Sequence, residues 1–336
     1  MGVEVELSSL APRASALVAA CAMDWLIGDP VCPAHPVRLM GRTLSFFEGR
    51  LRAAGWDGYG GGVCLFVMLS SLWVSAAIVA VLAFHAVHPA LGWTAHTLVV
   101  YTLLALKDLI VHAERVGAAA DAGDLAGARM AISHLVGRDT DRMDAAACRR
   151  AAIESASENL TDGFLSPIFW YVVAGIPGIV LFKVVSTMDS MVGYRTPRYL
   201  RFGWCGARAD DFMNLVPARV SWLLVAAAAA FLPGCSARKS LHVAWTQHAI
   251  VPGPNSGWSE AAVAGAIQRR LIGPIWVKGT LVTDRWLGAP GDPEAGSAED
   301  LARANRLVLA SGMLFCGAAT WILCTEIALD FIPCVW

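Results

Sequence analysis

Charged residues are scarce in this chain: 26 Lys or Arg and 27 Asp or Glu make up only 16% of its 336 residues. A typical soluble domain carries about 25%, because a soluble exterior needs polar groups that face water. Hydrophobic residues reach 56%, and the mean hydropathy is +0.54. This composition excludes a disordered chain and argues against a soluble enzyme, so we expect a polytopic membrane protein. The net charge of −1 gives no reason to expect nucleic acid as a partner.

Several motifs of soluble catalysis are also missing. No two of the nine cysteines form a C-x-x-C pair, so the sequence indicates neither a zinc ribbon nor a redox dithiol. No Gly precedes any of the four Lys, which excludes a P-loop. The H-E-x-x-H zinc pattern and the G-x-S-x-G nucleophile elbow are absent too. Any phosphate or metal chemistry must therefore use other residues.

Long apolar stretches supply the expected membrane spans. Residues 63–84, 91–106 and 307–329 each approach or exceed the roughly 20 residues that cross a bilayer. Residues 14–28 are shorter and contain Asp24. This segment lacks the basic start and small-residue end of a signal peptide, so we expect it to be retained as a fourth span.

Two further apolar stretches, residues 163–182 and 220–232, are ambiguous, because short or broken stretches often re-enter the membrane or are buried in protein. Basic residues are absent from 85–90, which marks the outer side. If both ambiguous stretches cross, residues 183–219 lie outside with six basic residues; if neither crosses, every basic segment lies inside. We favour the second arrangement.

The expected fold is therefore all-α. It is a polytopic helical membrane protein with about four true spans, broken or re-entrant helices and cytosolic helical segments. We expect a single membrane-embedded domain over residues 1–336. Its cytosol-facing segments, which we expect to be catalytic, are 29–62, 107–162, 183–219 and 233–306.

The first of three unusual polar stretches follows Asp24. Two rigid turn elements, Asp29-Pro30 and His35-Pro36, arise because the residue before proline is held extended. They would set Asp29, His35 and Arg38 at the cytosolic end of the first helix. A plain helix-end turn with an interfacial arginine remains the alternative interpretation.

The second stretch begins with an acidic helix. Asp144 can cap its start, and the Gly after Asp162 would end it. Glu154, Glu158 and Asp162 are four residues apart and so share a face. Like charges at this spacing repel, which favours a resident cation such as magnesium. A solvated surface helix is the alternative.

Beyond the broken apolar stretch, the chain becomes dense in cations and carboxylates. Its candidate side chains are Lys183, Asp189, Arg195, Arg208, Asp210 and Asp211. Cations of this kind suit phosphates, and paired carboxylates suit metal or acid–base chemistry.

The third stretch, 252–260, offers Asn255 and Glu260 as ligands and Ser259 as a helix cap. Helix capping alone explains much of this pattern, so both interpretations stay open.

These stretches resemble the adenosylcobinamide-phosphate synthase family of cobalamin biosynthesis. The resemblance covers residues 24 to about 310. It is carried by DWLIGDP with HPVRLMG (24–41), GRDT (137–140), ESASENLTDGFLSPIFW (154–170), KVVSTMDSMVGYRTPRYLRFGWCGARADDFMNLVPAR (183–219), PNSGWSEAAVAGA (254–266) and IGP (272–274).

The resemblance implies an integral membrane acid–amine ligase. Members join adenosylcobyric acid to (R)-1-amino-2-propanol phosphate, or to aminopropanol, with ATP and Mg²⁺. Because ATP is cytosolic, the active site would face the cytoplasm from a multi-pass protein of the inner (cytoplasmic) membrane. Membrane lipid, other enzymes of the pathway and a second copy of the chain are the implied partners.

We further hypothesise a role for each of the candidate residues. Magnesium would be bound by Glu154, Glu158, Asp162 and Asp189. Phosphates of ATP and of the amine would be held by Lys183, Arg195 and Arg208. The base would be Asp210 or Asp211. Substrate amides would be oriented by Asn255 and Glu260, and the site would be closed by His35 and Arg38. The set expected to act in catalysis is Glu154, Glu158, Asp210, Asp211 and Glu260.

Two other functions remain open. A transporter of a corrinoid or another solute would explain Asp24 and the broken stretch 163–182. A membrane scaffold for corrin enzymes would need fewer acids and cations than the three stretches contain.

Overall fold

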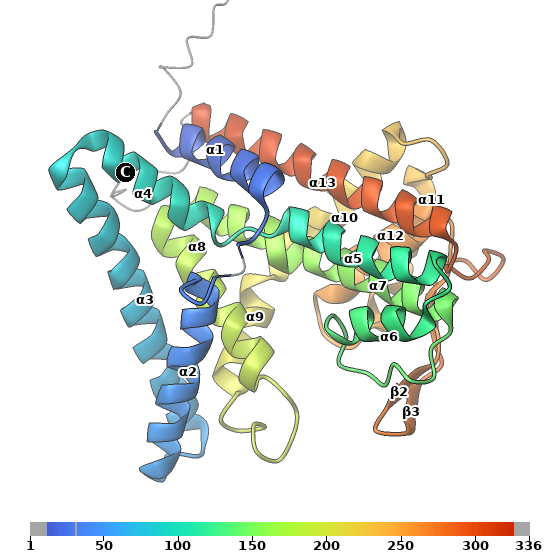
Figure 1. Ribbon diagram of the computed structural model, residues 1–336, viewed down its shortest axis with the longest axis horizontal. Coiled ribbons are helices and arrows are strands. Elements are labelled where there is room, and N and C mark those ends of the chain that lie inside the picture. Colours follow the sequence, from blue (N-terminus) through green and yellow to red (C-terminus); the bar gives the residue numbers. More distant parts are fainter. Residues whose placement is uncertain (1–11, 31, 326–336) are drawn as a thin grey trace, which may run out of the picture. The chain divides into compact units, whose positions relative to one another are not determined.

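A computed structural model describes residues 12–30 and 32–325, and helices dominate it, which confirms the all-α prediction (Figure 1). The chain divides into two compact units. The first contains Met1–Ala105, Ser166–Met213 and Cys316–Trp336, and the second contains Leu106–Leu165 and Asn214–Phe315. Each unit is described separately below. The single membrane-embedded domain stays a prediction.

The first unit is built from long helices. They are α1 (Pro12–Ile27), α2 (Pro36–Ala53), α3 (Tyr59–Val87), α4 (Pro89–Tyr101), α8 (Ser166–Val192), α9 (Trp204–Met213) and the end of α13 (Ala298–Cys324). Helix α3 packs against α4 and α8, and α1 packs against α4.

Two glycines allow the start of α3 to approach neighbouring backbone, Gly62 at the loop before α9 and Gly61 at the loop before α3. A Cβ on Gly62 would lie 2.0 Å from the carbonyl oxygen of Phe202, and one on Gly61 would lie 2.0 Å from that of Trp56. Neither position can hold a side chain without moving backbone. Gly61 and Gly62 therefore set how closely the start of α3 packs against these backbone segments.

Helix α8 is broken, as its Pro and Gly residues predict. Ala174 and Gly175 have non-helical backbone angles, with φ of 62° at Gly175. The break frees backbone carbonyls, and Arg13 of α1 donates to those of Tyr171 and Val172, at 3.0 Å to the latter. The side chain of Arg13 thus satisfies groups that would otherwise be costly in an apolar surrounding.

The second unit mixes shorter helices with small strands. Its helices are α5 (Leu106–Asp121), α6 (Leu125–Ser133), α7 (Ala145–Leu160), the π-helix η2 (Thr161–Leu165), α10 (Leu215–Phe231), α11 (Ala237–Gln247), the 3-10 helix η3 (His248–Ile250), α12 (Ser256–Ile267) and α13 up to Phe315. Strand β1 (Leu271–Ile272) pairs antiparallel with β4 (Trp286–Leu287), and β2 (Ile275–Val277) pairs antiparallel with β3 (Thr280–Thr283).

Helix α12 is the buried centre of the second unit. Every residue from Gly257 to Ile267 is buried, and α7, α10 and α11 pack around it. Its small residues permit this packing, since a Cβ on Gly265 would lie 2.4 Å from the carbonyl oxygen of Lys239. A charged side chain on α12 is therefore enclosed by protein.

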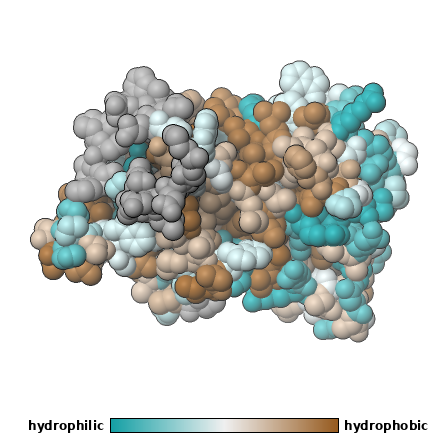
Figure 2. All heavy atoms as spheres, turned by 90° about the horizontal axis from the view of Figure 1, so that it is seen from above, coloured by the Kyte–Doolittle hydropathy of each residue, from teal (hydrophilic) through white to brown (hydrophobic). Residues whose placement is uncertain are grey.

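Four helical stretches in the described part are long and apolar enough to cross a membrane, the number that the sequence predicts: Tyr59–Val87, Pro89–Asp121, Ala145–Val192 and Ala298–Cys324. The number of candidate spans rises to five if α9 and α10 together form one broken span. Only 17% of the apolar window of α3 is buried within the chain, as lipid contact requires. Figure 2 shows hydrophobic side chains exposed on the face in view.

These four stretches are not the same four segments that the sequence predicts to cross the membrane. Segment 14–28 forms the 16-residue helix α1, which is shorter than the four, so its crossing stays a prediction. The ambiguous stretch 163–182 lies within Ala145–Val192, because η2 joins α7 to α8 without ending the helix. The end of the predicted span 307–329, including Glu326, lies outside the described residues.

Candidate active site

The first polar stretch forms a compact turn in the first unit. Gly28 follows α1 with φ of 75°, a conformation that glycine adopts without strain. The Nε2 atom of buried His35 lies 2.8 Å from Oδ1 of Asp29. Pro36 begins α2, where its fixed φ suits the first helical position. The turn thus brings Asp29 and His35 together, whereas Arg38 lies exposed in the first turn of α2.

Four predicted site residues line one pocket of the first unit, with a volume of about 250 Å³: Asp189, Arg195, Arg208 and Asp211. Nη1 of Arg208 donates to Oδ2 of Asp211 at 2.9 Å. Tyr194, Tyr199 and Trp204 line the same pocket. Two guanidinium groups beside two carboxylates suit a phosphate that arrives with a cation.

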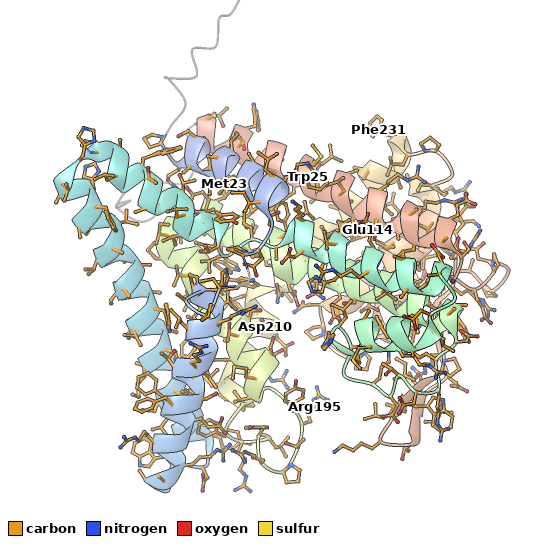
Figure 3. The ribbon with its side chains drawn as sticks, in the orientation of Figure 1. Met23, Trp25, Glu114, Arg195, Asp210 and Phe231 are labelled. Carbon is orange, nitrogen blue, oxygen red and sulfur yellow. The ribbon has the colours of Figure 1, made fainter. Side chains whose placement is uncertain are left out.

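The other two candidates of this stretch lie near the pocket in sequence but do not line it. Lys183 is half-buried on α8, two turns before Asp189. Asp210 is half-buried on α9 next to Asp211. Figure 3 shows Asp210 on that helix and Arg195 on the loop that precedes it.

The acidic helix α7, in the second unit, begins as predicted but does not end as predicted. Asp144 caps it, with its Oδ1 accepting from the backbone N–H of Ala147 at 2.7 Å. The expected stop near Asp162 and Gly163 is wrong, because the chain enters η2 and continues as α8. A π-turn contains extra residues per turn, so Asp162 departs from the four-residue alignment that it was expected to share with Glu154.

Glu154 is held by two partners within the second unit. It is buried, Arg138 forms an ion pair with its Oε2, and its Oε1 accepts from the backbone N–H of Ile272 at 2.8 Å. Both carboxylate oxygens are therefore engaged by groups of the chain itself. This arrangement makes Glu154 a structural anchor of the acid cluster, and its predicted role in magnesium binding stays a prediction.

Ile272 is strained at this contact. Its φ is 71°, which is rare for a β-branched residue and costs roughly 1–3 kcal/mol. Glu154 accepts from its N–H, and Nε of Arg150 donates to its carbonyl at 3.2 Å. Two residues of α7 thus hold the strained segment from both sides. Such strain persists only where the surroundings impose it.

Glu260 is the most enclosed of the predicted acids. Its side chain is 6% exposed on α12. Burial raises the pKa of Glu260 well above its ordinary value, and the charges of Glu158 and Glu154 raise it further, whereas Arg138 lowers it. Helices α7 and α12 pack against each other, and the term acid cluster is used for Glu154, Glu158 and Glu260, whose charges act on one another. Glu158 is its exposed member.

Asn255 lies at the start of α12, next to an aromatic group. Nη1 of Arg219 lies 3.4 Å from its Oδ1, and the guanidinium stacks over the Trp258 ring at 5.1 Å. His248 stacks on Trp258 with 3.8 Å between ring centroids. The expected cap at Ser259 is wrong, because the helix already begins at Ser256 and Ser259 lies within it.

The predicted magnesium ligands are divided between the units. Three belong to the second unit and one to the first: Glu154, Glu158, Asp162 and Asp189. Among the described residues, no group of three or more His, Cys, Asp or Glu side chains is placed to hold a metal ion. Magnesium bound together with substrate phosphates commonly uses only one or two carboxylates. The pocket that contains Asp189 and Asp211 fits this smaller requirement.

Sequence reasoning gave no role to the residues that hold the acid cluster. Arg138 belongs to the GRDT motif, and its cationic charge could have indicated a carboxylate partner. Arg150 lies four residues before Glu154 on α7, a spacing that places both on one face. Nothing in the sequence indicated the role of Ile272, because a β-branched residue is not expected at positive φ.

Comparisons with known proteins give one consistent family. The family described as CobD/Cbib protein matches residues 17–308. Cobalamin biosynthesis protein CobD of Rhizobium meliloti (strain 1021) is 39% identical over 314 residues, which cover 90% of this chain and 95% of that protein. CobD of a Sinorhizobium species is 39% identical over 293 residues, covering 84% and 90%.

Cobalamin biosynthesis protein CbiB of Salmonella arizonae is 36% identical over 309 residues, covering 89% of this chain and 95% of that protein. No solved structure gives a significant match. The family match includes α7, α12 and the pocket of the first unit, so both groups of predicted site residues fall within it. The chain belongs to the CobD/Cbib protein family.

Proposed function

We propose that this protein is an acid–amine ligase of cobalamin biosynthesis. It joins adenosylcobyric acid to (R)-1-amino-2-propanol phosphate, or to aminopropanol, and uses ATP and Mg²⁺. Relatives named as cobalamin biosynthesis proteins support the pathway. The observation that carries the proposed reaction is the pocket where Arg195 and Arg208 meet Asp189 and Asp211.

An unactivated carboxylate does not react with an amine at a useful rate, so ATP has to activate it. In our proposal, a carboxylate oxygen of adenosylcobyric acid attacks the γ-phosphorus of ATP and ADP leaves. The amine nitrogen then attacks the acyl carbon, the C–O bond to phosphate breaks, and the nitrogen loses a proton. Arg195 and Arg208 stabilise the negative charge on the phosphoryl oxygens during transfer.

Magnesium would neutralise phosphate charge in this pocket, with Asp189 and Asp211 as its carboxylates. Lys183 remains our second candidate for phosphate binding. Asp210 is available as a base beside the pocket. His35 and Arg38 are proposed to close the site. Asn255, held beside Arg219, would orient amides of the corrin side chains.

We place the protein in the cytoplasmic membrane with its active site facing the cytoplasm, where ATP is found. The four helical stretches with the length and apolarity of spans support a membrane location. Lipid is then one partner, and other enzymes of the pathway or a second copy of the chain are the remaining ones.

A purified-protein assay tests this function. The protein in detergent receives adenosylcobyric acid, Mg-ATP and the amine with or without its phosphate, and each component is omitted in turn. Mass spectrometry should find a corrinoid that gains the mass of the amine less one water, only when ATP is present. Tight corrinoid binding without product under every condition would contradict the ligase proposal.

The structure gives the transporter alternative little support. The break in α8 is one of its two sequence features, and Arg13 already satisfies the carbonyls of Tyr171 and Val172 at that break. A transported ion is not needed to explain it. The scaffold alternative offers no account of the buried acid cluster around Glu260.

A further inference from the structure

Helix α2 contacts the loop that forms part of the pocket of the first unit. This loop, residues 193–203, joins α8 to α9 and is named the pocket loop. Arg195 lines the pocket from the loop, whereas Asp189, Arg208 and Asp211 line it from the two helices. The position of the loop therefore decides whether Arg195 lies beside the other charged groups of the pocket.

The backbone hydrogen bonds of the pocket loop are local. The N–H groups of Tyr199 and Leu200 donate to the carbonyl of Thr196, and the N–H of Gly203 donates to the carbonyl of Tyr199. These bonds form turns within the loop and do not fix it against another element. Residues 194–198 are all exposed. A loop held only by its own turns opens easily, because few contacts oppose its motion.

Arg52 of α2 supplies a contact from outside the loop. Its Nη2 donates to the backbone carbonyl of Arg198 at 3.1 Å, its Nε donates to Glu48 at 2.8 Å, and its Nη1 donates to Asp57 at 3.3 Å. The guanidinium also lies over the ring of Phe202, 4.3 Å from its centroid. The planar fork of one arginine thus joins α2, the turn before α3 and the pocket loop.

Glu48 adds a second contact from the same helix. It is 7% exposed, and its Oε1 accepts from Nε of Arg52 and, at 3.2 Å, from Nη2 of Arg198. A buried carboxylate is costly unless positive groups accompany it, and these two guanidinium groups do so. The charge of Glu48 therefore favours the loop position that keeps Arg198 within reach.

We infer that Glu48 and Arg52 are positioning residues that hold the pocket loop, and with it Arg195, against the rest of the pocket. Neither belongs to the described residues that line the pocket, so both act through the loop. The inference rests on the proposed function for its ligand, because that function assigns phosphate of Mg-ATP to this pocket. A loop that is in place before binding loses less conformational freedom when the phosphate arrives.

Hydrogen exchange of the ligand-free protein in detergent tests these contacts directly. Arg52→Lys keeps the positive charge and removes the planar fork. The amides of Tyr199, Leu200 and Gly203 should then exchange about fivefold faster or more, while those of α4 keep their wild-type rates. Equal acceleration in α4 would mean general destabilisation and would overturn the positioning role.

Arg50→Lys is the matched control. Arg50 is exposed on the same helix, and its guanidinium lies over the ring of Phe46, 5.2 Å from its centroid. The substitution should leave exchange of the pocket loop unchanged. Glu48→Gln is the second test variant, which keeps the size of the side chain and removes its charge. It should accelerate loop exchange as Arg52→Lys does, and it serves alone if Arg52→Lys fails to fold.

Binding of Mg-ATP, followed by calorimetry, tests whether the loop acts through Arg195. Arg52→Lys should weaken binding about fivefold, because only part of the population then has the loop in place. Saturating Mg-ATP should restore slow loop exchange, so KM for ATP rises while kcat stays at the wild-type value. In an Arg195→Ala background, Arg52→Lys should change the affinity less than about twofold, since the residue that it positions is gone.

The outcomes separate this inference from the proposed function. Unchanged loop exchange in both test variants overturns the positioning role and leaves the ligase in place. The same loss of Mg-ATP affinity with and without Arg195 also overturns it. Faster loop exchange in both variants, with neither Mg-ATP binding nor product formation by wild type, supports the positioning role and contradicts the ligase.

Discussion

The buried pair of Arg138 and Glu154 shows how single residues determine the second unit. Each side chain is about nine-tenths buried, and Glu154 also fixes the strained Ile272. Removing one member of such a pair leaves an uncompensated charge in the interior, which costs more than the pair contributes when intact. The arrangement is therefore sensitive to loss of either partner.

We predict that Arg138→Gln lowers the free energy of unfolding by about 3–5 kcal/mol. Adding Glu154→Gln to this variant should recover much of the loss, because the buried charge is then gone. Chemical denaturation in detergent, with the double-mutant cycle completed, measures both effects. A single variant within about 0.5 kcal/mol of wild type would contradict the assigned contact.

Glu260 should make stability depend on pH. Burial raises its pKa in the folded protein above the ordinary value of 4.5, so the folded state binds this proton more tightly than the unfolded state. Stability from this group is therefore lost as pH rises from about 4.5 through the raised value. Each unit of pKa corresponds to about 1.4 kcal/mol.

The substitution Glu260→Gln removes the loss of stability that the buried carboxyl group causes as pH rises. We expect the variant to match wild type near pH 4 and to become increasingly more stable as pH rises towards 8, without substrate present. Melting temperatures across this range check the prediction, with Glu299→Gln as the control, because the side chain of Glu299 is 72% exposed. A stability difference that is constant with pH, or that grows on acidification, would contradict it.

At the level of elements, the start of α3 depends on close backbone contact. A Cβ at position 62 would lie 2.0 Å from the carbonyl oxygen of Phe202, while one at Gly60 would have no atom within 4 Å. Both glycines belong to the first turn of the same helix. They form a matched pair in which only the surroundings differ.

We predict that Gly62→Ala destabilises the protein by about 2 kcal/mol or more through this clash. Gly60→Ala should be neutral or stabilising by up to about 1 kcal/mol, because alanine favours helix. Thermal unfolding of the two variants in the same detergent provides the comparison. Equal effects at both positions would show that the contact with Phe202 is not tight.

The elements also show what sequence reasoning could and could not predict. The cap at Asp144 and the break at Gly175 follow from local residue chemistry, and both are confirmed. The π-turn after α7 is different, because no local signal distinguishes Thr161–Leu165 from a helix stop ending at Gly163. Continuation into α8 depends on long-range packing, so the predicted helix end is wrong.

At the level of the whole molecule, the predicted site residues come from segments far apart in sequence. The residue types of the site and their approximate clustering in sequence could be predicted. One pocket does bring together Asp189, Arg195, Arg208 and Asp211. Their division between two units could not be predicted, because it depends on contacts across more than a hundred residues. The partners of Glu154 were missed for the same reason.

Membrane orientation gives a prediction for the whole chain. Cys205 on α9 lies in the stretch 183–219, which we place in the cytoplasm. A variant with Cys205 as its only cysteine should resist a membrane-impermeant maleimide in intact cells and react in inverted vesicles. Val87→Cys in the cysteine-free protein is the control, since Val87 is 75% exposed and lies in a segment expected outside. Labelling of Cys205 from outside would reverse the proposed topology.

The central claim is that ATP activates the carboxylate of adenosylcobyric acid for amide formation. Its most direct test uses substrate labelled with ¹⁸O in that carboxylate, incubated with the purified protein, Mg-ATP and the amine. The proposed transfer moves one labelled oxygen to the γ-phosphoryl group, so mass spectrometry should find one ¹⁸O in the inorganic phosphate for each amide formed. Amide product accompanied by unlabelled phosphate, or ATP hydrolysis without amide, would contradict the account.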